Sequence, residues 1–282
     1  MPKPRPASPG AAPLPDTSGT RSREWLRLGK GKGVLFILLL MVIWELLVVG
    51  KVIEMVSFPR MSTILATFVR GIFTGEILNE LGPSLARMFA GYLLAILVGV
   101  AIGVAMGHFS LLYELLEPLT ELLRPIPSPA YIPIAILFLG VGENMKIFTI
   151  FFGSLFPVLL NTYSGVRNVD RVQIDTARTF GLGTAAMVWE IIIPAASPYI
   201  LTGMRVSAGI SLILVVISEM IASNSGIGYY ILDMQRSFHI AEMYAGVMTL
   251  AVLGYLLNWL FLKLEKGLIG WNVAQRPRGQ DA

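Results

Sequence analysis

Long stretches without a charged side chain constrain this chain more than any other feature of its sequence. Three of them, residues 88–107, 147–166 and 243–262, are each 20 residues long and contain no Asp, Glu, Lys or Arg. A bilayer core about 30 Å thick needs roughly 20 apolar residues per helix. The sequence therefore predicts helices that cross a membrane.

Three further stretches are close to this length. Residues 34–49 contain only Glu45, residues 125–142 are uncharged, and residues 191–218 are interrupted only by Arg205. None of these stretches alternates apolar with polar residues, as the strands of a barrel would. In hydrocarbon a helix satisfies its own backbone hydrogen bonds. We therefore predict an all-α membrane protein with six spans, near 33–50, 84–107, 116–140, 146–165, 200–221 and 242–262.

Composition excludes several classes of protein. Hydrophobic residues make up 55% of the 282 residues and charged residues only 14%, against about 25% charged in soluble domains. Cysteine is absent, so disulfides and thiolate metal sites are excluded. No cluster of His, Asp or Glu has metal-ligand spacing, and no catalytic triad is arguable. The positive residues lie mostly near the ends, which does not favour a nucleic-acid-binding face.

The two ends differ from the central part of the chain. Six prolines lie within the first 24 residues, which predicts a disordered tail over 1–32. The first apolar stretch begins only at Val34, too late for a signal peptide. Residues 33–265 are predicted to form the transmembrane domain, and 266–282 a second tail. The glycines between Gly29 and Gly33 lack the G-x-x-x-x-G-K-[ST] pattern, so we expect no ATP hydrolysis by this chain.

The distribution of Lys and Arg predicts the orientation in the membrane. With the N-terminus inside, 14 of these residues fall on the cytoplasmic side and five, Lys51, Arg60, Arg70, Lys146 and Arg236, on the other. Cytoplasmic loops carry the excess of positive charge. Both termini are therefore predicted to be cytoplasmic.

The loop at 166–198, between the fourth and fifth spans, contains the clearest motif. Its apolar residues follow helical spacing near 169–180, and Gly181 suits the end of a short helix. Pro194 and Pro198 are expected to break the chain before the fifth span. Because so short a helix is marginal alone, we expect a partner's groove to hold it rather than the chain's own fold.

The residues of this loop resemble the EAA loop of inner-membrane permeases of binding-protein-dependent ABC importers. The spacing is Asp-Thr-Ala, three residues, Gly, nine residues, then Ile-x-Ile-Pro, where the family has Glu-Ala-Ala and Ile-x-Leu-Pro. The resemblance implies that this loop is a coupling helix seated in a groove of the ATPase. The implied coupling residues are Asp175, Thr176, Ala177, Arg178, Gly181, Ile191 and Pro194.

Other stretches are similar to one branch of that family, which imports aliphatic sulfonates, taurine, nitrate, bicarbonate and some thiamin precursors. They include residues 124–140, 165–170 and 218–228, and together they extend over roughly 84–265. The resemblance implies the six-helix bundle of a type I ABC importer permease in a bacterial cytoplasmic (inner) membrane. It implies a second, identical permease, two ATPase subunits that bind ATP and Mg²⁺, and an external substrate-binding protein. No cofactor is expected in this chain, and a sulfonate or taurine is favoured over nitrate, bicarbonate or a thiamin precursor.

Three sets of residues are candidates for the pathway or its gate, each with a plainer alternative. Pro127, Pro129 and Pro133 predict a bent third span, which either lines the pathway or is only kinked. The small residues of span two, including Gly99 and Gly103, suit packing within the subunit, or else a dimer or pore contact. Glu219 suits a solvated interface, or else a gate or partner contact.

Two other classes of protein were weighed against the importer. A secondary transporter should show paired ionisable groups at mid-membrane or broken repeats in two halves, and the sequence shows neither. A membrane enzyme or scaffold would need a polar catalytic cluster or a large domain outside the membrane. A co-purifying ATPase chain would separate the importer from both.

Overall fold

The computed structural model of the protein describes residues 21–51 and 57–269, and every regular element among them is helical. The chain divides into two compact units, residues 1–62 and 63–282, which are described separately. Five described helices are long and apolar enough to cross a membrane, and a bent helix pair brings the number to six. The fold is therefore the all-α membrane protein predicted from the sequence.

The first unit is dominated by α1 (Arg21–Val49), of which Lys32–Val49 is the apolar part. Helix α1 includes residues 21–32, which the sequence analysis assigned to the tail over 1–32. Near the other end, the carboxylate of Glu45 accepts hydrogen bonds from Ser62 N and Ser62 Oγ, at 3.1 and 2.8 Å. The parts of the predicted tails at 1–20 and 270–282 lie outside the described residues.

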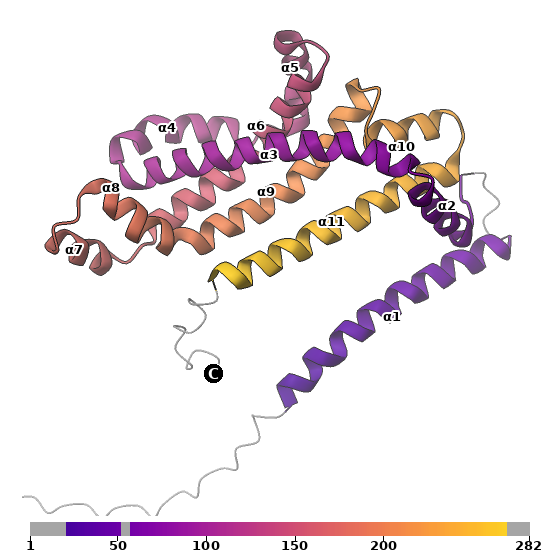
Figure 1. Ribbon diagram of the computed structural model, residues 1–282, viewed down its shortest axis with the longest axis horizontal. Coiled ribbons are helices and arrows are strands. Elements are labelled where there is room, and N and C mark those ends of the chain that lie inside the picture. Colours follow the sequence, from indigo (N-terminus) through magenta and orange to yellow (C-terminus); the bar gives the residue numbers. More distant parts are fainter. Residues whose placement is uncertain (1–20, 52–56, 270–282) are drawn as a thin grey trace, which may run out of the picture. The chain divides into compact units, whose positions relative to one another are not determined.

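The second unit is built around three helices that pack in series. Helix α3 (Glu76–His108) lies against α6 (Glu143–Arg167), and α6 lies against α9 (Ile193–Ala222). Helices α10 (Ile227–Arg236) and α11 (Ile240–Ile269) pack on each other and on α9. The short α2 (Met61–Phe73) precedes α3, and Figure 1 shows it at the same end of this unit as α10.

A stripe of small residues explains how closely α3 approaches α6. Methyl groups added at Gly91, Gly99, Gly103 and Gly107 would lie 2.5–3.0 Å from side chains of α6. Ala95, on the same stripe, is fully buried. Small faces let helix backbones approach closely in lipid, where van der Waals packing drives association. The stripe therefore serves packing within the chain, which was one of its two predicted roles.

The third predicted span is interrupted. Helix α4 (Ser110–Leu123) is followed by a 3-10 turn, η1 (Ser128–Tyr131), and by α5 (Ile132–Leu139), and the two halves are bent by 94°. The four-residue connection 124–127 contains two prolines, which lack the N–H that a continuous helix requires. The bend expected from the prolines is confirmed, and Figure 1 shows α5 projecting from the bundle.

The fifth span is longer than predicted. Helix α8 (Thr184–Met187), a π turn at Val188–Ile192 and α9 form one run of 39 residues, so the predicted break at Pro194 and Pro198 is wrong. Pro194 lies just after the π turn, whose wider turn accommodates the proline ring and the missing N–H. Pro198 leaves the carbonyl of Pro194 without its helical donor, and Ser197 Oγ donates to it at 2.8 Å. The π turn and this hydroxyl absorb both prolines without a break.

Candidate functional site

The Asp-Thr-Ala motif of the sequence forms a short helix with a defined cap at each end. Helix α7 (Arg171–Thr179) begins after Asp170, whose carboxylate accepts from Val172 N at 2.9 Å. At the other end Leu182 N donates to Ala177 O at 3.1 Å and Gly181 N to Arg178 O at 2.9 Å. This pair of bonds is a Schellman motif, and Gly181 occupies its left-handed position with φ +77°.

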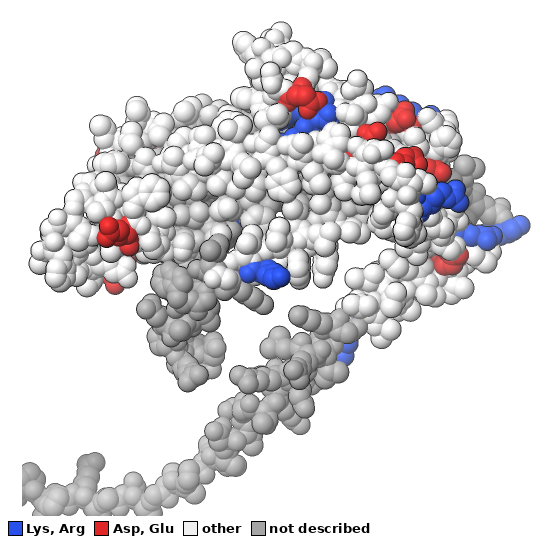
Figure 2. All heavy atoms as spheres, viewed as in Figure 1, with Lys and Arg blue, Asp and Glu red and all other residues white. Residues whose placement is uncertain are grey.

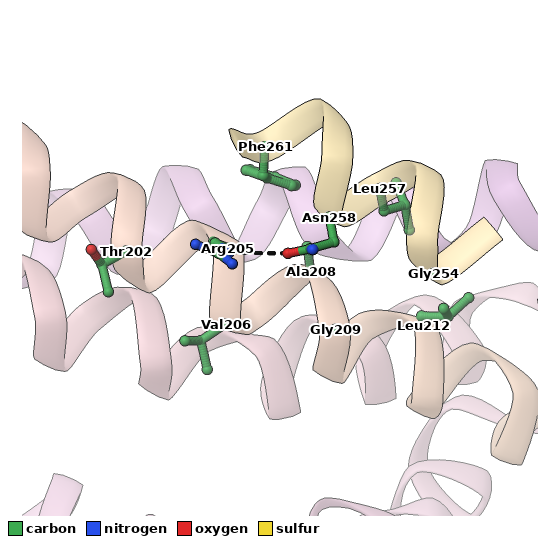
Figure 3. A pocket seen from close by; sticks show the side chains of 10 residues that line it. All are labelled: Thr202, Arg205, Val206, Ala208, Gly209, Leu212, Gly254, Leu257, Asn258 and Phe261. Atoms are coloured by element: carbon green, nitrogen blue, oxygen red, sulfur yellow. Dashed lines mark hydrogen bonds between the residues drawn. The ribbon is translucent and has the colours of Figure 1, made fainter. Parts of the chain in front are cut away.

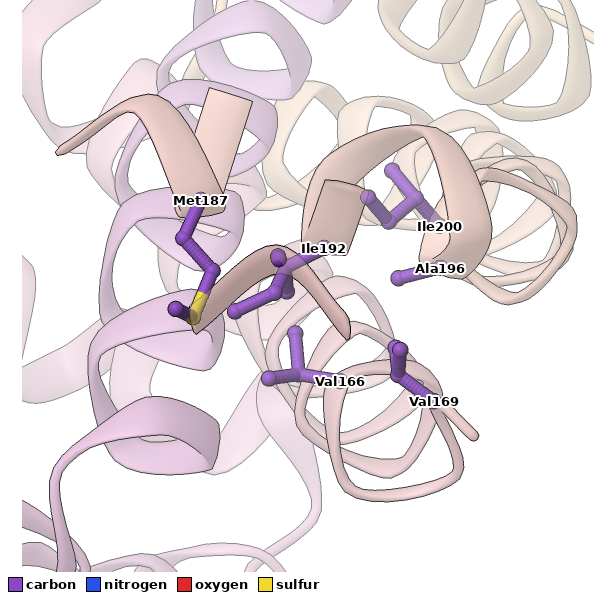
Figure 4. Packing of buried hydrophobic residues seen from close by; sticks show 7 residues of the cluster. Val166, Val169, Met187, Ile192, Ala196 and Ile200 are labelled. Atoms are coloured by element: carbon purple, nitrogen blue, oxygen red, sulfur yellow. The ribbon is translucent and has the colours of Figure 1, made fainter. Parts of the chain in front are cut away.

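One face of α7 packs on the chain's own core. Ala177 is 5% exposed and belongs to a cluster with Val166, Val169, Met187, Ile192, Ala196 and Ile200, which Figure 4 shows at the ends of α6 and α9. Ile174 and Leu182 pack against the same cluster. The expectation that α7 is held by a partner's groove rather than by its own fold is wrong for this face. These small apolar contacts are enough to hold α7 on the core, because the caps at its two ends already stabilise the helix.

Beside this packed face, α7 borders an open apolar recess, which shares Ala177 and Leu182 with it. Its volume is about 360 Å³, and it is lined by Val172, Gln173, Thr176, Ala177, Phe180, Leu182 and Ile191. Val172 is 68% exposed and Phe180 79%. Asp175 and Arg178 are exposed and face each other at 3.6 Å. Of the predicted coupling residues, Thr176, Ala177 and Ile191 therefore line one recess. Asp175 and Arg178 lie on the same helix as this recess. Pro194 lies in α9 and is not part of the lining.

A network of charges joins α3, α6 and α9 towards the α10 end of the unit, buried at Arg87, Lys146 and Glu219 and exposed at Glu143. Arg87 on α3 donates from Nε and Nη2 to the two carboxylate oxygens of Glu143, at 2.6 and 2.8 Å. Its Nη1 donates to Glu219 on α9 at 2.7 Å and to the carbonyl of Ser225 at 2.9 Å. Lys146 donates to Glu143 at 3.0 Å and to Ser223 Oγ at 2.9 Å. Arg87 and Lys146 are both buried, and each has an acidic partner.

Glu219 lies at the centre of this network. Its side chain is fully buried, and besides Arg87 it accepts from Ser84 Oγ and from Gly228 N, the latter at 3.0 Å. The solvated interface favoured from the sequence is therefore wrong. A buried carboxylate is tolerated only when it is paired and hydrogen-bonded, and Glu219 meets both conditions.

The turn between α9 and α10 is held by the same groups. Gly226 has φ +108°, and a methyl group added there would lie 2.3 Å from the carboxylate of Glu219. Gly226 N donates to Glu80 at 2.6 Å and Ile227 N to Ser84 Oγ at 2.8 Å. Sequence analysis missed Ser84, Glu80 and Gly226, because each is unremarkable in its own segment. The available indication was an acidic and a basic residue, Glu219 and Arg87, each within a span.

The predicted pathway residues separate into two groups. Gly99 and Gly103 are buried against Val158 and Thr162 of α6, so we no longer propose them for the pathway. Pro127 and Pro133 are exposed and Pro129 is half-buried, all three at the bend between α4 and α5.

A second recess, of about 470 Å³, lies between α9 and α11. Figure 3 shows Arg205 and Asn258 facing each other across it, and Arg205 Nε donates to Asn258 Oδ1 at 3.2 Å. Glu265 lies 3.8 Å from Arg205. Arg205 thus has polar partners on α11, which sequence reasoning did not identify.

With this geometry established, comparison with known proteins defines the class of protein. Residues 91–270 match the family described as "Binding-protein-dependent transport system inner membrane component". The chain belongs to this family. It is therefore the membrane permease component of an ABC importer, as the EAA-like loop indicated.

Three permeases with named transport systems are similar to most of this chain. The chain is 35% identical over 264 residues to SsuC of Bacillus subtilis (strain 168), a permease protein named for aliphatic sulfonates transport, covering 93% of this chain and 96% of that protein. It is 28% identical over 203 residues to the taurine transport system permease protein TauC of Escherichia coli (strain K12), covering 72% and 74%. It is 31% identical over 224 residues to the nitrate import permease protein NrtB of Leptolyngbya laminosa, covering 77% and 80%.

Solved structures share the fold at low sequence identity. The MetNI methionine ABC transporter, in an inward-facing conformation, superposes with a TM-score of 0.58 at 17% identity, covering 73% of this chain and 97% of that one. An amino acid ABC transporter gives a TM-score of 0.56 at 18% identity, covering 71% and 95%. The fold is therefore that of a type I ABC importer permease.

Proposed function

We propose that two copies of this chain form the pathway of an importer for a small anionic solute such as a sulfonate or taurine. Two separate ATPase subunits supply the energy, and an external substrate-binding protein delivers the solute. The names of SsuC and TauC support this solute class. Nitrate is the alternative favoured by the similarity to NrtB, and bicarbonate or a thiamin precursor follows it.

The observation that carries the proposal is the two-sided environment of α7. One face packs on the ends of α6 and α9, while the adjoining surface presents exposed Val172 and Phe180 beside an open apolar recess. A helix fixed to the bundle on one side and open on the other suits a mechanical connection to a separate subunit. We assign this open face to the ATPase, with Asp175, Thr176 and Arg178 as its polar contacts.

Coupling then follows from how α7 is attached. Closure of the ATPase pair on ATP and Mg²⁺ displaces α7, and the apolar cluster carries that displacement to α6 and to the α8–α9 run. Because packed interfaces shift between discrete arrangements rather than deform continuously, the displacement reorients whole helices from inward-open to outward-open. Gly181 and Pro194 keep the exits of the loop rigid.

The bend between α4 and α5 is our candidate for the pathway wall. Pro127, Pro129 and Pro133 lie at it, and α5 exposes Leu137 and Phe138, each 79% exposed. Non-helical backbone at membrane depth is tolerated where it lines a cavity or is buried in protein. We assign this segment to the cavity between the two permease copies, with both chain termini in the cytoplasm.

The ATPase contact is tested with a pair of matched substitutions. Val172→Asp places a charge inside the recess, and Ala185→Asp places the same charge on an exposed residue of α8 outside it. Only Val172→Asp should reduce co-purification of the ATPase subunit and ATP-driven uptake in proteoliposomes. Equal effects of the two substitutions would show that the recess is not part of the interface with the ATPase subunit.

The solute class is tested on the same reconstituted importer. Uptake of radiolabelled taurine, ethanesulfonate and nitrate is measured with and without ATP in the vesicles, in the presence of the binding protein. We expect ATP-dependent uptake of a sulfonate. Uptake of nitrate, without uptake of taurine or ethanesulfonate, would instead identify nitrate as the solute.

A further inference from the structure

Two phenylalanines at the end of the unit formed by α2 and α10 are almost fully exposed. Phe73, the last residue of α2, is 87% exposed, and Phe238, two residues beyond α10, is 80% exposed. Neither ring contributes to the packing clusters of the described chain. An exposed aromatic ring on a loop is more informative than an exposed aliphatic side chain on a membrane span, which lipid covers.

Phe238 also holds an unfavourable backbone conformation. His239 N donates to Met234 O at 2.9 Å and Phe238 N to Gln235 O at 3.2 Å, so α10 ends in a Schellman motif. Phe238 occupies the left-handed position of this motif, with φ +59°. The same position after α7 is filled by Gly181. A bulky residue in this region is strained, and such strain persists where a side chain has a function.

The surroundings of these rings are polar. A recess of about 280 Å³ lies between α2, α3, α10 and α11, and its lining includes the charged residues Arg70, Glu76 and Glu242 together with His239. Residues 235–239 are all exposed. Figure 2 shows charged side chains gathered over α2 and α10, while the surface over α3 and α4 is almost free of charge. Charged groups of both signs do not lie against hydrocarbon, so this end faces water or protein.

We infer that Phe238 and Phe73 are the anchors of a docking surface for the importer's external substrate-binding protein. This rests on the proposed function, which assigns α7 to the cytoplasmic ATPase. Figure 1 shows α7 and α10 at opposite ends of the unit, so the α10 end faces the compartment of the binding protein that the family description names. Aromatic anchors surrounded by mixed charges are typical of the energetic centre of protein interfaces.

The test uses the whole importer, permease with ATPase, in nanodiscs. The probe is the binding protein that stimulates ATP hydrolysis by the wild-type complex, and its Kd is measured by biolayer interferometry. Phe238→Gly removes the ring and relieves the strain at φ +59°, so the apparent Tm should not fall. The Kd should rise at least tenfold for Phe238→Gly and for Phe73→Ala, and less than threefold for Phe238→Tyr, which keeps the ring. Tyr255→Ala, which removes another exposed ring, 69% exposed and on α11, is the control and should bind normally.

Each other result overturns the inference in a recognisable way. A wild-type Kd for the double variant Phe238→Gly/Phe73→Ala would show that the rings do not contact the binding protein. Loss of permease self-association in these variants would make the surface a contact between permease copies. A wild-type complex that co-purifies with its ATPase but is stimulated by no binding protein would contradict the inference and leave the ATPase contact standing. Loss of ATPase co-purification from the wild type would instead contradict the proposed function.

Discussion

Arg87 and Glu219 form an ion pair between α3 and α9, with Nη1 2.7 Å from Oε1 and both side chains buried. The two residues are 132 positions apart in sequence. It also fixes the turn before α10, because the carbonyl of Ser225 accepts from Arg87 and Gly228 N donates to Glu219. The α10 end of the bundle is therefore a single hydrogen-bonded unit rather than a set of independent loops.

Removing one partner of this pair should destabilise the protein more than removing both. Arg87→Met leaves Glu219 buried without its counter-charge, which costs about 3–5 kcal/mol for buried pairs. The double variant Arg87→Met/Glu219→Met removes the unpaired charge and should recover much of the loss. Apparent unfolding temperatures of the purified permease in detergent measure both. Equal losses in the single and double variants would mean that the charge pair does not determine stability here.

Gly181 should be required for coupling because of its backbone conformation rather than for lack of space. Its φ is +77°, while no atom lies within 4 Å of an added methyl group. Gly181→Leu should leave the permease in the membrane but reduce co-purification of the ATPase and uncouple ATP turnover from transport. Gly181→Asn should retain more function, since Asn tolerates the left-handed region.

Gly183 provides the matched control for that experiment. It is two residues further on, has equally open space around it and has φ −69°, which any residue adopts. Gly183→Leu should therefore retain the complex. If Gly181→Leu and Gly183→Leu behaved alike, the left-handed turn would have no role in coupling.

The α3–α6 contact should be sensitive to single methyl groups. At Gly103 an added methyl group would lie 2.7 Å from both Leu159 O and Thr162 Cβ, whereas Gly209 on α9 has open space. Gly103→Ala is expected to cost about 1–3 kcal/mol by overpacking, and Gly209→Ala should cost nothing measurable. Thermal melting of the two variants measures this difference in stability. An unchanged melting temperature for Gly103→Ala would mean that α3 and α6 are not held this closely.

Membrane orientation can be read with single cysteines, because the chain contains none. The excess of Lys and Arg predicts that Gly10→Cys and Arg278→Cys are shielded from an impermeant thiol reagent in intact cells. Ser237→Cys, at the exposed end of α10, should be labelled from outside. Labelling of Gly10→Cys and Arg278→Cys but not of Ser237→Cys would contradict the predicted orientation and assign α7 to the external side of the membrane.

Much of the coupling site could be predicted from residues close together in sequence. The spacing around Ala177 and Gly181 gave the position of α7 and its glycine stop, and the prolines after Arg124 gave the bend of the third span. The prediction at Pro194 and Pro198 was wrong because a π turn and the Ser197 hydroxyl supply what the two prolines lack. A prediction from proline considers that residue alone, whereas the hydrogen bonds of the neighbouring turns decide whether the helix breaks or continues.

By itself the sequence determined which segments enter the membrane and which short loop carries the coupling motif, because hydropathy and helical spacing are properties of adjacent residues. Tertiary structure alone decided that Glu219 is buried against Arg87 rather than solvated, and that Gly99 and Gly103 contact α6 rather than a pore. It also decided that Phe238 fills a left-handed position after α10, as Gly181 does after α7. The physical reason is that burial, pairing and close approach depend on distances between helices, and those distances result from the packing of segments far apart in the chain.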